Sequence, residues 1–140
     1  MLEYEKDNLF ATFEAVVGGI MAEKLQDPKN QKNLKKFKAK INLGLEISED
    51  FVYWVNLCAE DGVFQLGRGA LNDDFDLILL SAPEDLLFFC NGENGVVHMM
   101  TKKNRFGRRK LRFSKGTTGW NIGKLLTLSK ILVLDKKQGP

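Results

Sequence analysis

The stretch from Phe75 to Gly92 constrains the fold more than any other part of the chain. Its first six residues are almost wholly apolar and too few for an ordinary helix, which predicts a strand buried on both faces. Ser81 and Glu84 then have the spacing of a capping box, and Pro83 suits the first turn of a helix. Two leucines and two phenylalanines follow before an Asn-Gly stop. A buried strand joined to so apolar a helix needs a large apolar partner, which is either protein or a ligand.

The length of 140 residues predicts one domain spanning 1–140, with a core at about 8–134 and a flexible tail at 135–140. A composition of 44% hydrophobic and 28% charged residues is that of a globular protein, and no apolar run is long enough to span a membrane. The charged N-terminus does not resemble a signal peptide. Cys58 and Cys90 are isolated within apolar runs, which predicts buried free thiols in a reducing compartment. We therefore expect a cytoplasmic protein.

Helical and period-two patterns predict the remaining elements. In chain order these are a helix from about Leu9 to Gln26, a polar lysine-rich connector at 29–37, strands at Ile41–Ile47, Phe51–Cys58 and Val63–Leu66, a short helix at Val96–Met100, a strand at Arg109–Ser114, and a last helix from about Trp120 or Asn121 to Leu134. Asp61-Gly62 is typical of a tight hairpin turn. The short spacing of the first four strands predicts an antiparallel meander, and the mixture of elements predicts an α+β fold.

The side chains that carry chemistry are few. His98 is the single histidine, so a triad or a metal cage built on imidazoles is not expected, and neither cysteine has zinc spacing. The acidic run at 72–76 lacks the glycine and distal glutamate of a calcium loop. Serines and threonines fall in caps and turns. The sequence therefore predicts neither a catalytic centre nor a metal site, and it predicts no cofactor.

The short helices and the last helix carry more apolar residues than one buried stripe requires. Two explanations remain open: these residues form the core and an oligomer interface, or they line an apolar cavity. Methionine suits the wall of an adaptable pocket, and aromatic side chains suit flat or linear apolar ligands. The strand Phe51–Cys58, which is apolar on both faces, also hints at a homodimer through the sheet face.

Basic residues are distributed unevenly. Two runs without acidic residues, Lys29–Lys40 and Lys102–Lys115, hold 14 of the 21 lysines and arginines. Such a run can bind nucleic acid through counterion release, or it can be attracted to an anionic membrane surface. It can also be a solvated face that acidic residues elsewhere in the chain balance.

The order of these elements resembles the sterol carrier protein 2-like domain family. The segment Asn33–Ile47, in which apolar residues alternate from Lys40 to Leu45, resembles the first strand of that family. Asp61-Gly62 followed by an apolar strand and Gly67 is similar to its "glycine, apolar strand, glycine" segment. The stretch opening at Phe75 and closing at Asn91-Gly92 resembles the strand that enters a short helix, and Asn121–Leu132 resembles the closing helix. The resemblance covers residues 8 to 134.

The resemblance implies a five-stranded, mostly antiparallel sheet covered by helices, with an apolar tunnel between them. It implies a non-catalytic protein that holds a fatty acid, an acyl-CoA, a sterol or a similar lipid. The expected lining residues are Trp54, Leu77, Leu79, Leu87, Phe88, Val96, Met99, Met100, Ile122, Leu125, Leu126 and Leu132. The residues expected to meet an anionic head group or a partner are Lys103, Arg105, Arg108, Arg109 and Arg112.

The last helix is the expected gate, because it is terminal and its removal would expose the lining residues. Deletion of residues 121–140 is therefore predicted to abolish lipid uptake. The alternative function is a module that binds nucleic acid or an acidic protein partner through the two basic runs.

Overall fold

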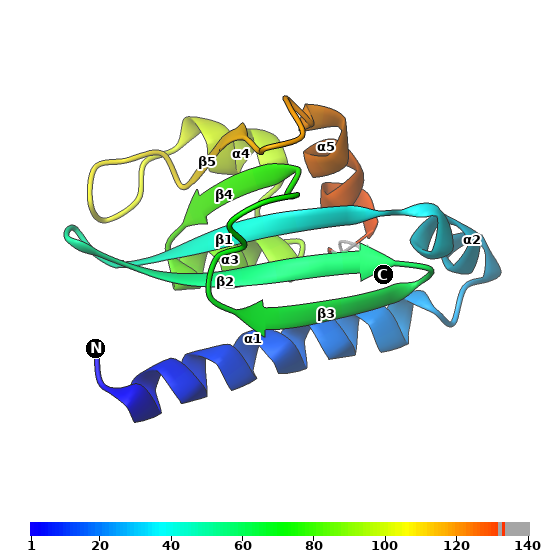
Figure 1. Ribbon diagram of the computed structural model, residues 1–140, viewed down its shortest axis with the longest axis horizontal. Coiled ribbons are helices and arrows are strands. Elements are labelled where there is room, and N and C mark those ends of the chain that lie inside the picture. The colour runs from blue at the N-terminus through cyan, green and yellow to red at the C-terminus, as the bar shows by residue number, and fades with distance from the viewer. Residues whose placement is uncertain (132, 134–140) are drawn as a thin grey trace, which may run out of the picture.

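A computed structural model describes residues 1–131 and 133. Within these residues five helices flank one five-stranded sheet (Figure 1). The elements are α1 (Glu3–Lys24), α2 (Pro28–Lys36), β1 (Ala39–Ser48), β2 (Phe51–Glu60), β3 (Val63–Arg68), β4 (Leu77–Ser81), α3 (Pro83–Cys90), α4 (Val96–Thr101), β5 (Leu111–Lys115) and α5 (Ile122–Ile131). None of the helices described is both long and apolar enough to cross a membrane. The predicted end of the last helix at Leu134 and the tail at 135–140 lie outside the described residues.

The sheet has the strand order β3-β2-β1-β4-β5. Three of its four pairings are antiparallel, which confirms a mostly antiparallel sheet, but β4 lies parallel to β1. The predicted meander of four strands is therefore wrong after its third strand. A parallel neighbour requires the chain to cross over the sheet rather than turn back beside the preceding strand.

The crossover between β3 and β4 runs over the face of the sheet that the helices leave uncovered (Figure 1). Asn42 on β1 fixes it there. Its side-chain amide donates to the carbonyl oxygen of Leu71 at 3.0 Å, and its side-chain oxygen accepts from the Leu71 N–H at 2.7 Å. Asn56, opposite Asn42 on β2, donates to the Gly69 carbonyl at 2.9 Å. Two asparagines in otherwise apolar strands thus determine the path of the connection.

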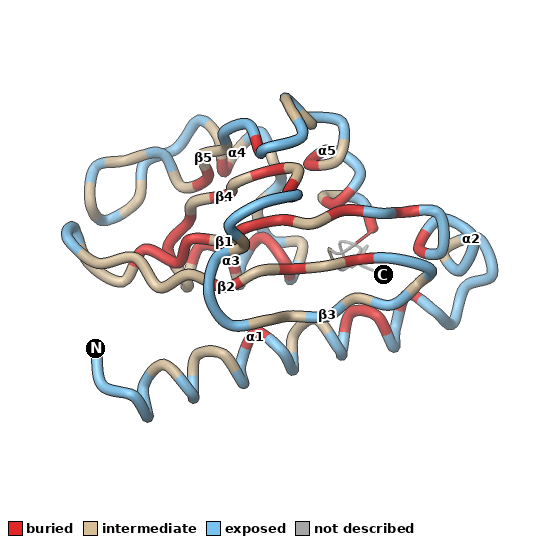
Figure 2. The backbone as a smooth tube through the Cα atoms, in the orientation of Figure 1, coloured by how far each residue is buried: buried red, intermediate tan, exposed pale blue. Residues whose placement is uncertain are grey.

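Alternation along each strand sends side chains to two different faces. On β1, the side chains of Ile41 and Leu45 face the helices, and those of Asn42, Gly44 and Glu46 face the other side. All five helices contribute residues to one apolar core on the helix side. Figure 2 shows that the buried residues are concentrated in the central strands and on the inner sides of the helices. Below, the two sides are called the helix face and the crossover face.

The predicted β2–β3 hairpin is confirmed. Asp61 and Gly62 both have positive φ angles, 51° and 81°, as a two-residue turn between antiparallel strands requires. On the crossover face, a side chain at Gly44 would collide with Leu80 and press against Trp54 and Val52. Glycine at this position therefore lets these neighbours close over β1.

Two local predictions are wrong. The lysine-rich segment at 29–37 is not a connector but mostly the helix α2, because Asp27 accepts from the Lys29 N–H at 2.9 Å as an N-cap and Leu34 is fully buried beneath it. Ser81 does not cap α3, because it remains in β4 opposite Leu45, and Ala82 occupies the N-cap position without a side-chain hydrogen bond. The predicted stop of α3 at Asn91-Gly92 and the predicted short helix α4 are both confirmed.

Candidate functional site

Most of the predicted lining residues meet on the helix face between β4 and the short helices. Leu77 and Leu79 of β4, Met99 of α4 and Leu125 of α5 are buried there, each with no more than 3% of its surface exposed. Leu87, Val96 and Met100 pack against this group while partly buried. The structure therefore brings these residues together in the apolar core between the sheet and the helices.

Three predicted lining residues on α3 and α5 are exposed, and together they are called the apolar rim below. Phe88, Ile122 and Leu126 are exposed by 45%, 44% and 46%. Trp54 does not join them, because it pairs with Gly44 on the crossover face, and the sheet separates it from the helices. A ligand held between sheet and helices would not touch Trp54, so that assignment is corrected. Leu132 lies outside the described residues.

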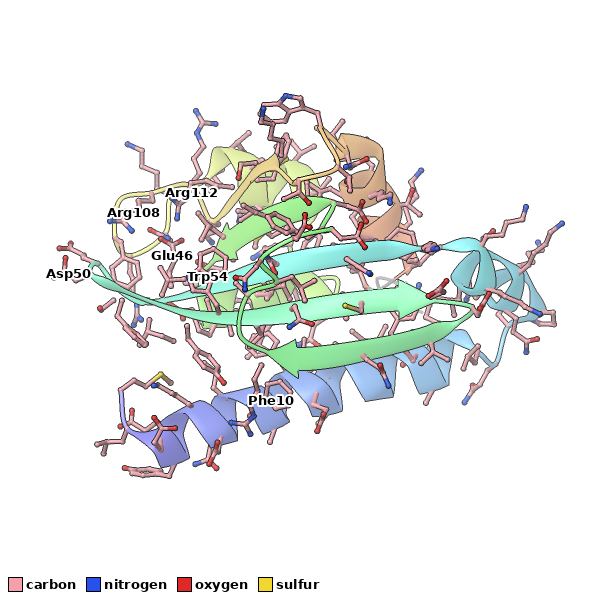
Figure 3. The ribbon with its side chains drawn as sticks, in the orientation of Figure 1. Phe10, Glu46, Asp50, Trp54, Arg108 and Arg112 are labelled. Carbon is pink, nitrogen blue, oxygen red and sulfur yellow. The ribbon has the colours of Figure 1, made fainter. Side chains whose placement is uncertain are left out.

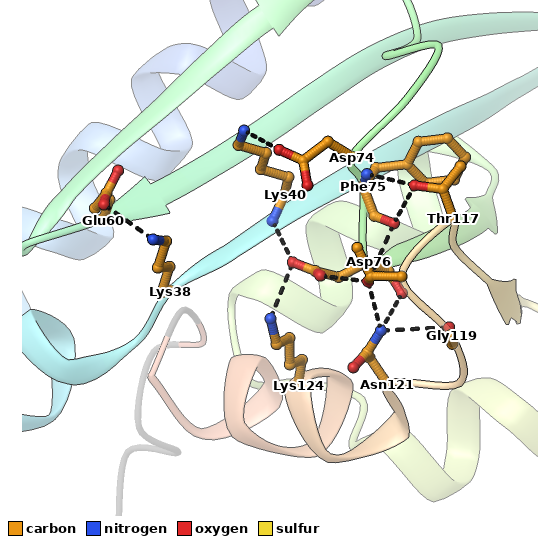
Figure 4. Close-up of polar contacts among 11 residues, drawn as sticks. Lys38, Lys40, Glu60, Asp74, Phe75, Asp76, Thr117, Gly119, Asn121 and Lys124 are labelled. Carbon is orange, nitrogen blue, oxygen red and sulfur yellow. Dashed lines mark hydrogen bonds and ion pairs between the residues drawn. The ribbon is translucent and has the colours of Figure 1, made fainter.

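The first turn of α5 is held by a polar node at Asp76, just before β4 (Figure 4). The Asp76 carboxylate accepts from the Lys40 N–H at 2.9 Å and the Thr118 hydroxyl at 2.6 Å, and it pairs with Lys124 at 3.0 Å. The Asn121 amide donates to the Asp76 carbonyl oxygen at 2.9 Å. Desolvation by itself raises the pKa of Asp76, but these hydrogen bonds outweigh it and lower the pKa below 3.8. The start of α5 is therefore pinned by charge and hydrogen bonds.

Residues 1–131 and 133 line, among others, two hollows at the margins of the sheet. The larger, of about 520 Å³, lies between α1 and β3 and mixes the apolar Val17, Phe64 and Leu66 with the polar Glu14 and Gln65. The second, of about 280 Å³, lies where β1, β2 and the start of α5 meet. Ion pairs surround it: Lys38 with Glu60 at 3.2 Å, Lys40 with Asp74 at 2.8 Å, and the Asp76–Lys124 pair (Figure 4). Neither hollow has the continuous apolar lining that the resemblance implies for a tunnel.

Two of the arginines predicted to meet an anionic head group bind a buried carboxylate instead. Arg108 and Arg112 converge on the Glu46 carboxylate on the crossover face, and Arg108 reaches it at 3.0 Å (Figure 3). Glu46 is only 1% exposed, so this carboxylate is held in the protein by its two cationic partners. Arg108 also donates to the carbonyl of Glu49 at 3.2 Å, in the turn between β1 and β2. The segment before β5 is thereby fastened to the β1–β2 hairpin.

Two further basic side chains of this segment also contact the protein itself, and a third is exposed. Arg105 pairs with Glu84 at 3.3 Å and donates to the Ile47 carbonyl at 3.0 Å, while Arg109 donates to the Met100 carbonyl at 2.9 Å. Lys103 is exposed, and no ion pair to it is found among residues 1–131 and 133. Four of the five predicted head-group residues, all except Lys103, therefore make contacts within the protein.

Burial affects three further titratable groups. It raises the pKa of Asp85 on α3, although Lys110, 3.7 Å away, favours the charged form. It raises the pKa of Cys90 to about 12, and it raises that of Cys58 against the influence of Lys40. The predicted free thiols are confirmed, with Cys90 buried and Cys58 only half-buried. In the described part of the chain, no three His, Cys, Asp or Glu side chains converge as metal ligands do.

Sequence reasoning missed Asn42, Glu46 and Asp76. All three could have been noticed in the sequence, because each polar residue interrupts or borders an apolar run. Strand alternation assigns each of them to the face of the sheet that the sequence predicts to be exposed to solvent. The alternation does not reveal that other backbone and side chains cover this side. That covering follows from the parallel placement of β4.

No protein-family model matches the chain, and no curated protein sequence matches it. Solved structures do match. Sterol carrier protein 2 from Yarrowia lipolytica, in its apo form, has a TM-score of 0.56 at 17% identity and covers 86% of each chain. The UbiJ-SCP2 ubiquinone synthesis protein has a TM-score of 0.59 at 11% identity, covering 91% of this chain and 95% of that one.

A sterol carrier protein domain from Helicoverpa armigera has a TM-score of 0.55 at 11% identity, covering 87% of this chain and 88% of that one. The sec-alkylsulfatase Pisa1 from Pseudomonas sp. has a TM-score of 0.56 at 14% identity, over 76% of this chain; the chain spans only 14% of that enzyme's length. The class is thus an α+β domain with a five-stranded mixed sheet. More particularly, the chain has the fold of sterol carrier protein 2 domains, as the sequence resemblance predicts.

Proposed function

We propose that this protein is a non-catalytic lipid carrier that holds a fatty acid, an acyl-CoA or a sterol between the sheet and helices α3–α5. The observation that carries this proposal is the apolar rim of Phe88, Ile122 and Leu126, which is exposed on helices that pack against the apolar core. Exposed apolar side chains on helices that cover the proposed site are available to contact an entering ligand. The likeness to proteins named sterol carrier proteins supports the same function.

Helix α5 is the element that would move to admit the ligand. Its start is fixed by the Asp76 node, but its body is held mainly by the apolar contacts of Leu125, Leu128 and Ile131. Apolar contacts have no fixed geometry, so an acyl chain can replace them with little loss. A ligand would separate α5 from β4 while the node keeps the helix attached, and burial contributes about 0.8 kcal/mol per CH₂ group before the costs of binding.

The test begins with native mass spectrometry of the purified protein, followed by organic extraction and uptake of a fluorescent fatty acid. A bound fatty acid, phospholipid, acyl-CoA or sterol would support the proposal and identify the ligand class. A clean apo mass, together with no uptake of the fatty acid or of a fluorescent sterol, would contradict it. The apolar rim would then belong to a protein interface.

A full-length variant sharpens this test. Ile122→Gln with Leu126→Gln removes two apolar side chains from the rim without opening the core, and uptake should weaken roughly tenfold. Val63→Gln is the matched control, because Val63 is an exposed apolar residue (58%) on β3, at the opposite edge of the sheet from β5. Equal uptake by the rim variant and the control would show that α5 does not form the entrance.

A further inference from the structure

A second surface follows β5 along the free edge of the sheet. We call it the β5 margin and define it by Val97, Lys102, Lys103, Lys115 and Trp120. Helix α4 packs beside β5, and the backbone bridge between Lys103 and Arg109 places the first two lysines at the start of the strand. At the other end, the bridge between Gly116 and Gly119 places Lys115 and Trp120 on the two sides of one tight turn. Figure 1 shows α4, β5 and the chain entering α5 gathered at this edge.

The β5 margin carries the two most exposed large apolar side chains of the described residues. Val97 is 72% exposed and Trp120 is 69% exposed, more than any rim residue of the proposed lipid site. A tryptophan in water loses the benefit of burying a large amphipathic ring. At a membrane interface the same ring is favoured, because its apolar body and its N–H can each find a suitable environment.

The three lysines of the β5 margin form no ion pair with an acidic residue in the described part of the chain. Within residues 1–131 and 133, no ion pair joins Lys102, Lys103 or Lys115 to a carboxylate, whereas Arg105, Arg108, Lys110 and Arg112 of the same run all pair with Glu46, Glu84 or Asp85. The arginines and Lys110 thus stabilise the fold, and the three lysines remain available to a partner. Exposed lysines beside exposed apolar side chains match the surface of an anionic bilayer.

We propose that the β5 margin docks the protein on anionic lipid bilayers, with Trp120 and Val97 entering the interface and the three lysines contacting lipid head groups. A nucleic acid would satisfy the lysines but would leave Val97 without a partner. A second copy of this chain would bring the same positive charges together, and like charges repel. The inference does not depend on lipid carriage, since docking is measured on the bilayer and carriage is measured by uptake.

The first experiment uses the two tryptophans as separate reporters. In a Trp54→Phe variant the emission comes from Trp120, and in Trp120→Phe it comes from Trp54 on the crossover face. Vesicles of phosphatidylcholine with phosphatidylserine should shift the Trp120 emission to the blue and leave that of Trp54 unchanged. No shift of Trp120, or an equal shift of both, would overturn the proposed orientation.

The second experiment measures vesicle co-sedimentation of a triple variant, Lys102→Gln, Lys103→Gln and Lys115→Gln. Partitioning onto phosphatidylserine vesicles should weaken by on the order of 100-fold, and adding salt should weaken the wild-type protein in the same direction. Lys29→Gln, Lys32→Gln and Lys35→Gln on α2 form the matched control, because they remove the same charge from three exposed lysines elsewhere. Equal loss in both variants would overturn the proposal.

Two further outcomes distinguish binding to a bilayer from binding to nucleic acid. Wild-type protein that fails to bind anionic vesicles overturns the proposal, whether or not it takes up a fatty acid. Binding to duplex DNA that is lost in the triple variant but unaffected by Trp120→Ala, without vesicle binding, would assign the three lysines to nucleic acid instead. The expected result for Trp120→Ala is a roughly tenfold weaker partitioning onto anionic vesicles.

Discussion

The two faces of the sheet are both covered, but different interactions hold each cover in place. On the helix face, Leu77 and its apolar neighbours pack against the helices in one apolar core. On the crossover face, Asn42 and Glu46 hold the crossing chain and the basic segment by hydrogen bonds and ion pairs. Apolar contacts tolerate exchange of one partner for another, whereas buried polar contacts require particular partners. The helix face is therefore the side on which the proposed ligand would be accommodated.

The largest expected effect tests how tightly the helix face is filled. Leu77→Ala should lower the free energy of unfolding by about 3 kcal/mol, because Leu77 is fully buried on a central strand. Urea denaturation measures this effect, and Val63→Ala at an exposed position of β3 should cost under about 0.5 kcal/mol. A Leu77→Ala cost below roughly 1 kcal/mol would mean that the helix face is loosely filled.

The next effect tests the crossover face. Glu46→Gln removes the charge that Arg108 and Arg112 share, and we expect a loss of about 2 to 3 kcal/mol in unfolding free energy. This loss is at the low end of what breaking a buried ion pair usually costs, because both arginines are partly exposed and can be rehydrated. Glu49→Gln is the control, since only the backbone carbonyl of Glu49 is used. If the two variants unfold at the same urea concentration, the carboxylate does not fasten the segment.

A smaller effect concerns the Asp76 node, which joins the two faces at the start of α5. The pKa of Asp76 is lowered in the folded state, so its contribution to stability is present above about pH 3.8 and is lost as the pH falls through its folded pKa. Asp76→Asn should cost about 1 to 2 kcal/mol at neutral pH and should reduce the loss of stability in acid. Urea denaturation across this range measures it, and an unchanged acid slope would contradict the assigned network.

Asp85 provides the opposite case for comparison. Its pKa is raised by burial, so its contribution to stability is fully present below pH 3.8 and is lost as the pH rises through its folded pKa. Asp85→Asn removes a slope that opposes that of Asp76, so it should steepen the loss of stability in acid, whereas Asp76→Asn should reduce that loss. The pair of variants separates the two carboxylates within one measurement.

The smallest effect compares one cysteine from each face. Cys90 on α3 is buried with a pKa of about 12, whereas Cys58 on the crossover face is half-buried. A thiol reagent at mildly alkaline pH should modify Cys58 first and Cys90 only as the protein unfolds. A Cys58→Ser variant should then show only the slow thiol, and rapid modification of that variant would reveal that the helix face opens in the native state.

Much of the local structure is predictable from the sequence. Alternation along β1, the Asp61-Gly62 turn and the stop at Asn91-Gly92 each depend on residues close in the chain, and the structure confirms them. The helix α2 escaped prediction because its lysines and asparagines give no apolar stripe, and its stability comes from the Asp27 cap and the burial of Leu34. Capping by Ser81 failed because pairing with Leu45 extended β4 through that residue.

The sequence by itself determined most of the elements, the apolar surplus of α3–α5 and the resemblance to sterol carrier protein 2-like domains, because these depend on spacing and composition. Only the tertiary structure decided that β4 pairs with β1, that Trp54 is separated from the predicted lining, and that Glu46 holds two of the arginines. The physical reason is that an apolar strand can pair with any edge of similar pattern, and a charge can pair with any opposite charge within reach. Contacts between distant segments select among these equivalent local possibilities.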